Sequence, residues 1–192
     1  MSTVRSGHQA ALVVVDAQVG VMAGAWDAPR VVHNIVLAIG RARRAGLPVV
    51  WVQHEGDDLA RGSAAWQLHA GLVPLPGEAR VYKRFQSSFE ATDLEAVLSS
   101  AGATHIVLAG AASNWCIRAT AYAALDRGYD LTLLKDAHTT EDIELDDGAR
   151  IKAADIVADL NLTLRWIAYP GRSSCAASVA DADALAPGGA AG

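Results

Sequence analysis

Short apolar runs rich in β-branched residues alternate along this chain with segments whose apolar residues recur at helical spacing. The first run covers residues 10–15 and the second covers residues 49–52. Between them, residues 30–45 have apolar side chains every three or four positions, and Gly46 and Pro48 end that helical pattern. A continuous apolar run is typical of a strand buried on both faces of a parallel sheet, and the strand–helix–strand order predicts a right-handed crossover.

The same alternation continues along the rest of the chain. Thr92, with Glu95 three positions later, is typical of a helix N-terminus, and residues 147–160 have the spacing of a further helix. Strands alternating with helices predict an α/β fold of three layers, α/β/α, in which a six-stranded parallel sheet of Rossmann-like arrangement lies between helices. The six predicted strands cover residues 10–15, 49–52, 79–83, 105–109, 129–134 and 162–167.

The length of the chain, 192 residues, suits a single domain that buries a full core. We expect this domain to cover residues 1–170, because the sequence after Pro170 is rich in Ala, Ser, Gly and Asp. Residues 171–192 are then a C-terminal extension, partly flexible at residues 187–192. Hydrophobic residues make up 52% of the chain and charged residues 19%, which indicates a compact protein with surface available to another subunit.

Charge and targeting signals exclude several kinds of partner. The formal net charge of −5, without any basic cluster, argues against nucleic acid and anionic membranes. The N-terminal residues lack the apolar core of a signal peptide and no apolar stretch has the length of a membrane span, so the expected location is cytoplasmic. The two cysteines, Cys116 and Cys175, lie far apart, which predicts free thiols rather than a disulfide or a metal motif.

Cys116 follows the apolar run at residues 105–109 and stands at the beginning of a helical pattern that Gly128 closes. The free N–H groups and the positive dipole end of a helix N-terminus favour a thiolate over a thiol, which predicts a reactive cysteine. The alternative is a packed cysteine, because this side chain is often buried as a small hydrophobe.

Two further polar residues stand at the ends of predicted strands. Asp16 follows the strand at residues 10–15, and Lys83 ends the strand at residues 79–83. Because the carboxyl ends of parallel strands meet at one edge of a sheet, we expect these two residues to converge with Cys116. A carboxylate there takes the proton of a thiol, a lysine stabilises the thiolate, and backbone N–H groups bind an oxyanion, which suits acyl transfer. Taken singly, Asp16 is a loop residue and Lys83 a surface lysine.

Three segments of the sequence resemble the isochorismatase-like cysteine hydrolases. They are residues 13–18, where a strand leads into Asp-Ala-Gln, residues 83–89, where a lysine precedes Ser-Ser-Phe, and residues 110–120 around the cysteine. They occur in the family's order, and the resemblance extends from about residue 10 to residue 168. It implies an isochorismatase-type fold with a six-stranded parallel sheet, and assembly as a homodimer or homotetramer.

The resemblance also implies roles for particular residues. In an Asp-Lys-Cys catalytic triad, Asp16 is the general base, Lys83 the charged partner and Cys116 the nucleophile. The family has a non-proline cis peptide before the cysteine, which here falls between Ala111 and Ala112, and this turn and the Cys116 backbone form the oxyanion site. The implied reaction hydrolyses a non-peptide C–N bond of a small molecule, in an amide, ureide or lactam, through a thioester and without a cofactor.

Other functions remain as alternatives. Isochorismatases proper cleave a vinyl ether and typically lack this cysteine, so Cys116 favours the amidohydrolase branch over a vinyl ether hydrolase. A non-catalytic protein on the same fold, which binds a small molecule or acts as a scaffold, is the second alternative. A nucleotide-binding oxidoreductase is disfavoured, because no Gly-x-Gly-x-x-Gly pattern follows the first strand.

Two departures from the family limit what is carried over. Asn114 stands where many members have an acidic residue. The Asp-x-His metal motif of the nicotinamidase branch does not match residues 53–58, so we expect no metal. A metal held by His54 and His69 is the less favoured alternative, because lone histidines near strand ends are usually hydrogen-bonded structural residues, and His138 is interpreted in the same way.

The sequence gives few indications of the substrate. Residues 53–56 and 66–69 resemble a subgroup that includes hydrolases of the streptothricin type, which open a lactam. The acidic residues Glu55, Asp57 and Asp58 suit a cationic substrate or simply form a solvated loop. Aromatic side chains near the carboxyl edge of the predicted sheet suit a flat or aliphatic substrate. Core packing or subunit contact is the alternative. The predicted substrate-binding residues are Gln18, Trp26, Trp66, Phe89 and Trp115.

Overall fold

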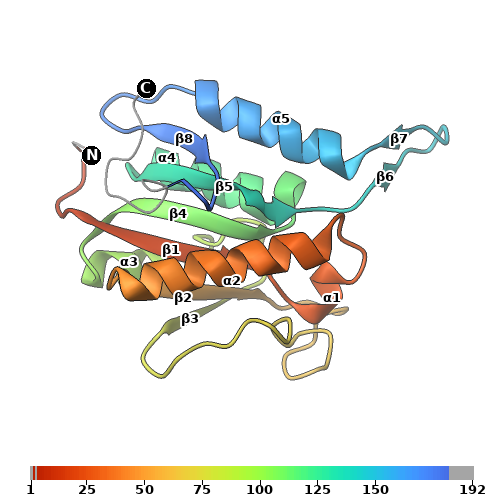
Figure 1. The fold of residues 1–192 in the computed structure, drawn as a ribbon, viewed down its shortest axis with the longest axis horizontal. Helices are drawn as coiled ribbons and strands as arrows, with labels where there is room; N and C mark the ends of the chain where they lie inside the picture. Colours follow the sequence, from red (N-terminus) through yellow and green to blue (C-terminus); the bar gives the residue numbers. More distant parts are fainter. Residues whose placement is uncertain (1, 3, 182–192) are drawn as a thin grey trace.

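Six parallel strands form the central sheet of the protein in a computed structural model, which describes Ser2 and residues 4–181 (Figure 1). The strand order β3-β2-β1-β4-β5-β8 places the first strand near the middle, with later strands added toward both edges. The predicted three-layer α/β/α fold is therefore confirmed. The strands are β1 (Gln9–Val15), β2 (Val49–His54), β3 (Ala79–Lys83), β4 (Ala103–Ala111), β5 (Asp130–Thr139) and β8 (Ser174–Ala177).

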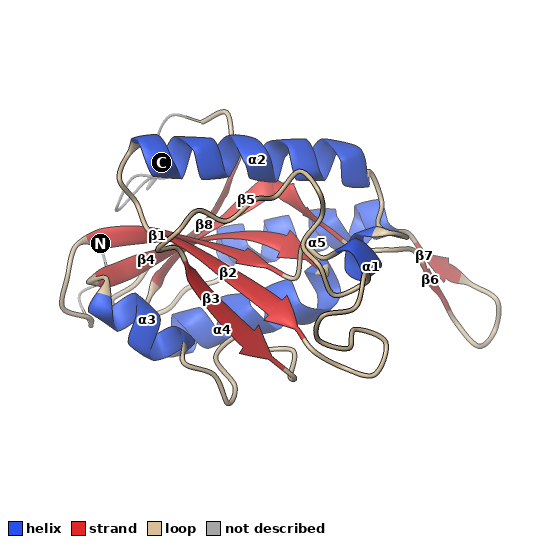
Figure 2. Cartoon of the chain, turned by 90° about the horizontal axis from the view of Figure 1, so that it is seen from below, coloured by secondary structure: helices blue, strands red, loops and turns tan. Residues whose placement is uncertain are grey.

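Helices cover both faces of this sheet (Figure 2). Alternate residues of β1 point to opposite faces, so that Leu12 packs in the core under α2 while Val13 packs in the core under α3, α4 and α5. The short hairpin of β6 (Ile143–Glu144) and β7 (Arg150–Ile151) projects from the body of the protein. The helices are α1 (Val19–Met22), α2 (Ala28–Arg44), α3 (Leu94–Ser100), α4 (Arg118–Asp126) and α5 (Ala153–Trp166).

Within Ser2 and residues 4–181, no helix combines the length with the apolar composition that crossing a bilayer demands.

The register of the inner strands brings their carboxyl ends to one edge of the sheet. Val15, the last residue of β1, lies opposite Val52 of β2 and Gly110 of β4. On the next pair, His54 lies opposite Lys83, the last residue of β3. The strands β2 and β4 are each two residues longer at this edge than the sequence predicts. The extension of β2 adds two polar residues, Gln53 and His54, to the edge.

Gly110 allows β4 to approach β1 closely at this edge. Its φ of +123° is one that residues with side chains rarely adopt. A Cβ atom built at this position would lie 1.9 Å from the carbonyl oxygen of Val15, which is far inside van der Waals contact. Only glycine therefore fits at position 110, where β1 and β4 end at the edge of the sheet.

The predicted strand at residues 162–167 is wrong, because residues 162–166 form the end of α5 and Ile167 caps it. Their apolar residues alternate, but the pattern also continues a helical face, in which Val157, Leu160 and Leu164 are buried while Leu162 and Trp166 are exposed. Burying the apolar face of the helix stabilises this segment more than a strand with alternating apolar residues would.

The sixth strand, β8, comes instead from the residues assigned above to a C-terminal extension. Ser174–Ala177 pairs with β5 along Leu131–Leu134, so the sheet is complete only with residues beyond 170. The side chain of Asp130 accepts hydrogen bonds from the N–H and the hydroxyl of Ser173, which fixes the beginning of this strand. The predicted flexible tail at residues 187–192 lies outside the described residues.

Three helices begin differently from the prediction, and one of them, α5, begins at Ala153 rather than at residue 147. The N-cap residue of α3 is Asp93 and not Thr92, and it makes no side-chain capping bond, so the predicted capping box is wrong. Thr92 Oγ1 accepts a hydrogen bond from Leu94 N–H at 3.3 Å, and Glu95 pairs with Arg5. After β4, residues Ser113–Ile117 form a single π-helical turn, η1, and α4 begins only at Arg118. Cys116 therefore lies in a widened turn before the helix and not in the first turn of the helix itself.

Candidate active site

Asp16, Lys83 and Cys116 meet at the carboxyl edge of the sheet. Asp16 directly follows β1, Lys83 ends β3, and Cys116 lies in η1 after β4. The Lys83 Nζ atom lies 2.6 Å from Asp16 Oδ2 and 3.1 Å from Cys116 Sγ. Both charged side chains are buried. The structure therefore places one ammonium group in contact with a carboxylate and a thiol, as the order of strands predicts.

Two further groups, neither of them predicted from the sequence, contact the same ammonium. The Nδ1 atom of His54 lies 3.1 Å from Lys83 Nζ, and the backbone carbonyl of Phe85 accepts a hydrogen bond from it at 3.2 Å. The sequence places His54 two residues after the predicted end of the second strand. Its side chain was interpreted only as structural or metal-binding.

Burial dominates the proton affinities of the site. It raises the pKa of Asp16 above its usual value, although the charge and hydrogen bond of Lys83 oppose the rise. It also raises the pKa of the Cys116 thiol to about 12, and the negative charge of Asp16 adds to this rise while Lys83 opposes it. The expected low-pKa thiolate at a helix N-terminus is therefore wrong for the resting protein, in which Cys116 carries its proton at neutral pH.

The backbone before Cys116 has an unusual conformation. The peptide bond between Ala111 and Ala112 is cis, as the resemblance implies. The Ala112 carbonyl accepts hydrogen bonds from the N–H groups of Trp115 and Ile117, each at 3.1 Å, which closes the widened turn. The assignment of Ala111, Ala112 and Cys116 to an oxyanion site stays a prediction.

Gln18, predicted to bind the substrate, is fully buried and bonds to the protein itself. Its Oε1 accepts a hydrogen bond from His54 N–H at 2.8 Å, and its Nε2 donates to the carbonyl of His54 at 3.1 Å and to that of Trp66 at 2.9 Å. These bonds occupy the amide, so we correct the prediction: Gln18 joins the loop after β1 to the end of β2.

Two of the four predicted aromatic residues also lie in the core rather than in a pocket. Trp66 is buried and packs against Tyr82 with 5.8 Å between ring centroids. Phe89 is buried and packs against Tyr129 at 5.9 Å, below the sheet face that α3 and α4 cover. Aromatic residues in loops near the edge of the sheet can form a pocket wall or a core contact, and the sequence does not separate the two, which explains both corrections.

The other two aromatic residues are exposed. Trp115 precedes the cysteine and is 58% exposed, and Trp26 is 39% exposed. The Trp26 N–H donates a hydrogen bond to the carbonyl of Thr140 at 2.7 Å, and the hydroxyl of Thr140 donates to Asn114 Oδ1 at 2.6 Å. Both tryptophans are therefore connected to η1, and both remain candidates for substrate contact.

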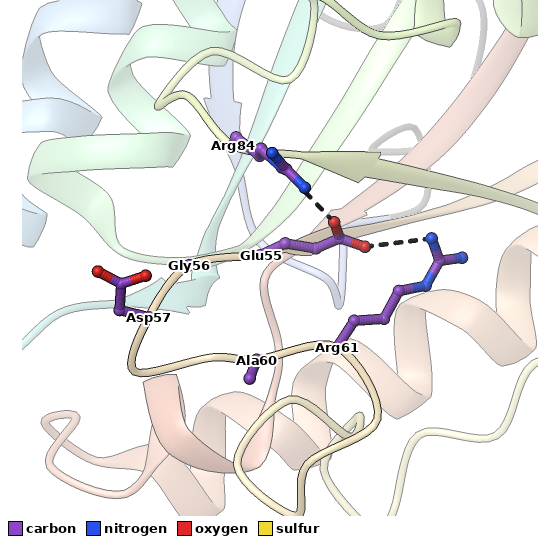
Figure 3. A pocket seen from close by; sticks show the side chains of 6 residues that line it. All are labelled: Glu55, Gly56, Asp57, Ala60, Arg61 and Arg84. Carbon is purple, nitrogen blue, oxygen red and sulfur yellow. Dashed lines mark ion pairs between the residues drawn. The ribbon is translucent and has the colours of Figure 1, made fainter.

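A pocket of about 480 Å³ lies beside this site, lined by the loop after β2 and by Arg84. Figure 3 shows the Glu55 carboxylate between two guanidinium groups, at 3.4 Å from Arg61 and 3.8 Å from Arg84, while Asp57 points to the other side of the loop. Glu55 is thus already paired with cations. A cationic substrate contact through Glu55, Asp57 and Asp58 stays a prediction.

Within Ser2 and residues 4–181, one group of side chains has the types and spacing of metal ligands. Asp16, His54 and Cys116 offer atoms that all lie within 4.8 Å of one another. Lys83 Nζ lies within 3.1 Å of an atom of each of them, so an ammonium group already sits among these atoms.

The other two histidines considered above have partners away from this cluster. The backbone N–H of His69 donates to the carbonyl of Ala17 at 2.9 Å, and its imidazole Nδ1 accepts a hydrogen bond from Gly71 N–H at 3.5 Å. The buried imidazole of His138 bonds to the Ser113 hydroxyl at 2.8 Å and to Asn161 Oδ1 at 3.0 Å, and burial lowers its pKa to about 4. These contacts fit the structural interpretation of both residues.

Known proteins of similar sequence include hydrolases. A streptothricin hydrolase of Streptomyces noursei is 39% identical over 140 residues, which cover 69% of this chain and 55% of that protein. This chain spans about half the length of the curated streptothricin hydrolases it matches, 55% of one and 50% of another. The secreted isochorismatase effector Isc1 of Verticillium dahliae is 31% identical over 153 residues, which cover 76% of this chain and 80% of that protein.

Solved structures share the fold. An isochorismatase from Pseudomonas putida is 30% identical with a TM-score of 0.79, over 90% of this chain and 89% of that chain. N-carbamoylsarcosine amidase from Thermoplasma acidophilum is 26% identical with a TM-score of 0.71, over 90% of this chain and 98% of that chain. The model of the isochorismatase domain matches residues 10–161. The chain therefore belongs to the isochorismatase family.

Proposed function

We propose that this protein is a cysteine-dependent hydrolase that cleaves a non-peptide C–N bond, in an amide, ureide or lactam of a small molecule. The observation that carries the proposal is the contact of one buried ammonium, that of Lys83, with both the Asp16 carboxylate and the Cys116 thiol. The similarity to a streptothricin hydrolase and to an N-carbamoylsarcosine amidase supports a C–N bond as the target.

In the first half of the reaction, Asp16 takes the proton from Cys116 while Sγ attacks the carbonyl carbon of the substrate. The electron pair of the C=O bond moves to oxygen, and we assign the backbone N–H groups of Ala112 and Cys116 to bind this oxyanion. The C–N bond then breaks, the leaving nitrogen receives the proton from Asp16, and the acyl group remains on Sγ as a thioester.

In the second half, Asp16 takes a proton from water while the water oxygen attacks the thioester. The C–S bond breaks, Cys116 recovers the proton from Asp16, and the product leaves as a carboxylic acid or carbamic acid. Lys83 keeps its three protons throughout, because a positive charge at that position favours each of the anionic forms that appear beside it.

Charge balance favours this order of events. A thiolate beside an ionised Asp16 would place two negative charges next to one cation, which agrees with the raised pKa of Cys116. Moving one proton from Sγ to Asp16 keeps a single negative charge beside Lys83 before and after the transfer. The thiol is therefore activated by its neighbour at the moment of attack and not by resting ionisation.

The test is release of ammonia or amine from a panel of small amides, ureides and lactams. Cys175→Ala is the matched control, because it removes the other cysteine of the chain. We expect the wild type and Cys175→Ala to turn over at least one class, with the acyl group found on Cys116 by mass spectrometry, and Cys116→Ala to be inactive. Equal turnover by Cys116→Ala, or binding of the panel without any turnover, would contradict the proposal.

A further inference from the structure

His54 touches the ammonium of Lys83 although it belongs to none of the three segments that carry the family resemblance. We propose that His54 is a positioning residue: as a neutral imidazole with its proton on Nε2, it accepts a hydrogen bond from Lys83 at Nδ1 and holds the ammonium between Asp16 and Cys116. This inference rests on the proposed function of the triad.

The number of donors and acceptors supports the proposal. The ammonium has three N–H groups and no lone pair, so any atom that hydrogen-bonds to it must accept. Four acceptors surround Lys83 Nζ, namely Asp16 Oδ2 at 2.6 Å, His54 Nδ1 at 3.1 Å, Cys116 Sγ at 3.1 Å and the carbonyl of Phe85 at 3.2 Å. Because Nδ1 must be one of these acceptors, the imidazole proton resides on Nε2.

The four acceptors divide into two kinds. Asp16 and Cys116 exchange a proton during the proposed reaction, so their strengths as acceptors change in opposite directions. His54 Nδ1 and the Phe85 carbonyl take no part in that exchange, and they accept with constant strength. Together they hold Lys83 Nζ in place while the negative charge moves from the carboxylate to the sulfur. The hydrogen bonds to His54 Nδ1, the Phe85 carbonyl and Cys116 Sγ account for the three N–H groups, and Asp16 Oδ2 faces the same ammonium as its ion-pair partner.

The surroundings of His54 keep it neutral. Lys83 faces the ring, and an imidazolium would bring a second cation to 3.1 Å from the first. Burial and the charge of Lys83 lower the pKa of His54 below its usual value, while the charges of Asp16 and Glu55 act in the opposite direction. The neutral form is thus the one present at neutral pH.

The backbone of His54 is also held firmly. The side chain of Gln18 bonds to both its N–H and its carbonyl, and the next N–H, that of Glu55, donates to the carbonyl of Lys83 at 2.8 Å. The register of β2 and β3 places His54 opposite Lys83. Several hydrogen bonds therefore fix the backbone that carries this ring.

Two substitutions separate the hydrogen bond from the packing of the ring. His54→Asn keeps an acceptor near the position of Nδ1, whereas His54→Leu has a similar volume without any acceptor. The probe is the rate constant for alkylation of Cys116 by iodoacetamide in the Cys175→Ala background, which requires no knowledge of the substrate. His69→Leu is the control, because the contacts of His69 lie with Ala17 and Gly71.

We expect His54→Leu to lower the alkylation rate roughly tenfold, and His54→Asn and His69→Leu to stay within about threefold of the parent. The same order is expected for kcat on any amide that the wild type cleaves. Equal rates for His54→Leu and the parent, or no rescue by Asn, would overturn the proposal. If the wild type cleaves no amide, the proposed function fails while this alkylation series still decides the role of His54.

A second measurement needs no variant. Imidazole ¹⁵N chemical shifts of His54 in the wild type report which nitrogen carries the proton. We expect the neutral Nε2–H form at pH 7, with unprotonated Nδ1. An Nδ1–H form or an imidazolium at pH 7 would overturn the inference, even if His54→Leu does not fold.

Discussion

Lys83 keeps its charge at a fully buried position, against the general preference of lysine for solvent. Such a charge persists only with close partners, and Asp16 supplies the opposite charge while Phe85 and His54 supply neutral acceptors. The same contacts that make the lysine tolerable also set the proton affinities of the carboxyl and the thiol. At this scale, stability and the proposed chemistry depend on one group.

Replacing Lys83 by Met is expected to destabilise the protein by about 3–5 kcal/mol near neutral pH, because it leaves the Asp16 carboxylate buried without a cation. Chemical denaturation measures the free energy of unfolding. The loss should shrink as the pH falls, because protonation of Asp16, whose pKa is already raised by burial, removes the unpaired charge. The double variant Asp16→Asn/Lys83→Met should be more stable than Lys83→Met. A double variant that is less stable than the single one would contradict this account.

The protonated state of Cys116 has a direct consequence for its reactivity. In the Cys175→Ala protein without substrate, the rate of alkylation by iodoacetamide should keep rising between about pH 6 and pH 10, because the thiol pKa lies near 12 and the thiolate is the nucleophile. Mass spectrometry of the modified peptide measures the rate. A plateau below about pH 8 would show a resting thiolate and refute the coupled proton transfer.

At the scale of elements, α5 shows how a helix and a strand compete for the same residues. Leu164 is buried in the core below the sheet, whereas Leu162 is 58% exposed. In a strand, these two residues would point to the same side, because side chains alternate. In the helix they lie on different sides, so their burial distinguishes the two structures.

Leu164→Ala should therefore cost about 2–5 kcal/mol of unfolding free energy, because it leaves a cavity in the core. Leu162→Ala, the matched control, should change the free energy of unfolding by less than about 0.5 kcal/mol. Urea unfolding of both variants provides the measurement. Equal costs at the two positions would contradict the helical assignment of this segment.

Strands β1, β2 and β4 could be predicted from sequence because each contains a continuous apolar run. The parallel order of these strands and β3 brought Asp16, Lys83 and Cys116 to one edge. The prediction ended the second strand at residue 52, two residues short of its end at His54. His54 was thus placed in a loop, and its contact with Lys83 was missed. That contact depends on strand register and side-chain direction, which local patterns do not encode. The same reason explains why Gln18, Trp66 and Phe89 were expected to face a substrate.

At the scale of the whole molecule, the sheet ends with a strand from beyond residue 170. β8 covers the edge of β5 and contributes to the layer on which α5 lies. The predicted division into a domain at residues 1–170 and an extension therefore cuts through the sheet. The homodimer or homotetramer and the cytoplasmic location stay predictions.

A chain that ends at residue 170 should be much less stable than the full chain, because it exposes the β5 edge and removes the partners of Asp130 at Ser173. We expect its melting temperature to fall by more than about 10 °C, or its cooperative transition to disappear. Circular dichroism of the two chains during heating measures this difference. A shortened chain with an unchanged transition would show that the fold is complete without β8.

At Gly110, β4 approaches the Val15 carbonyl of β1 so closely that no methyl group fits between them. Asp16 directly follows β1, and Cys116 lies in η1, a few residues after Gly110 of β4. The distance that the proton crosses between Cys116 and Asp16 therefore depends on the spacing of the two backbones at Gly110, although Gly110 takes no part in the reaction. A larger residue at position 110 would remove none of the reacting side chains, but it would move Asp16 away from Cys116.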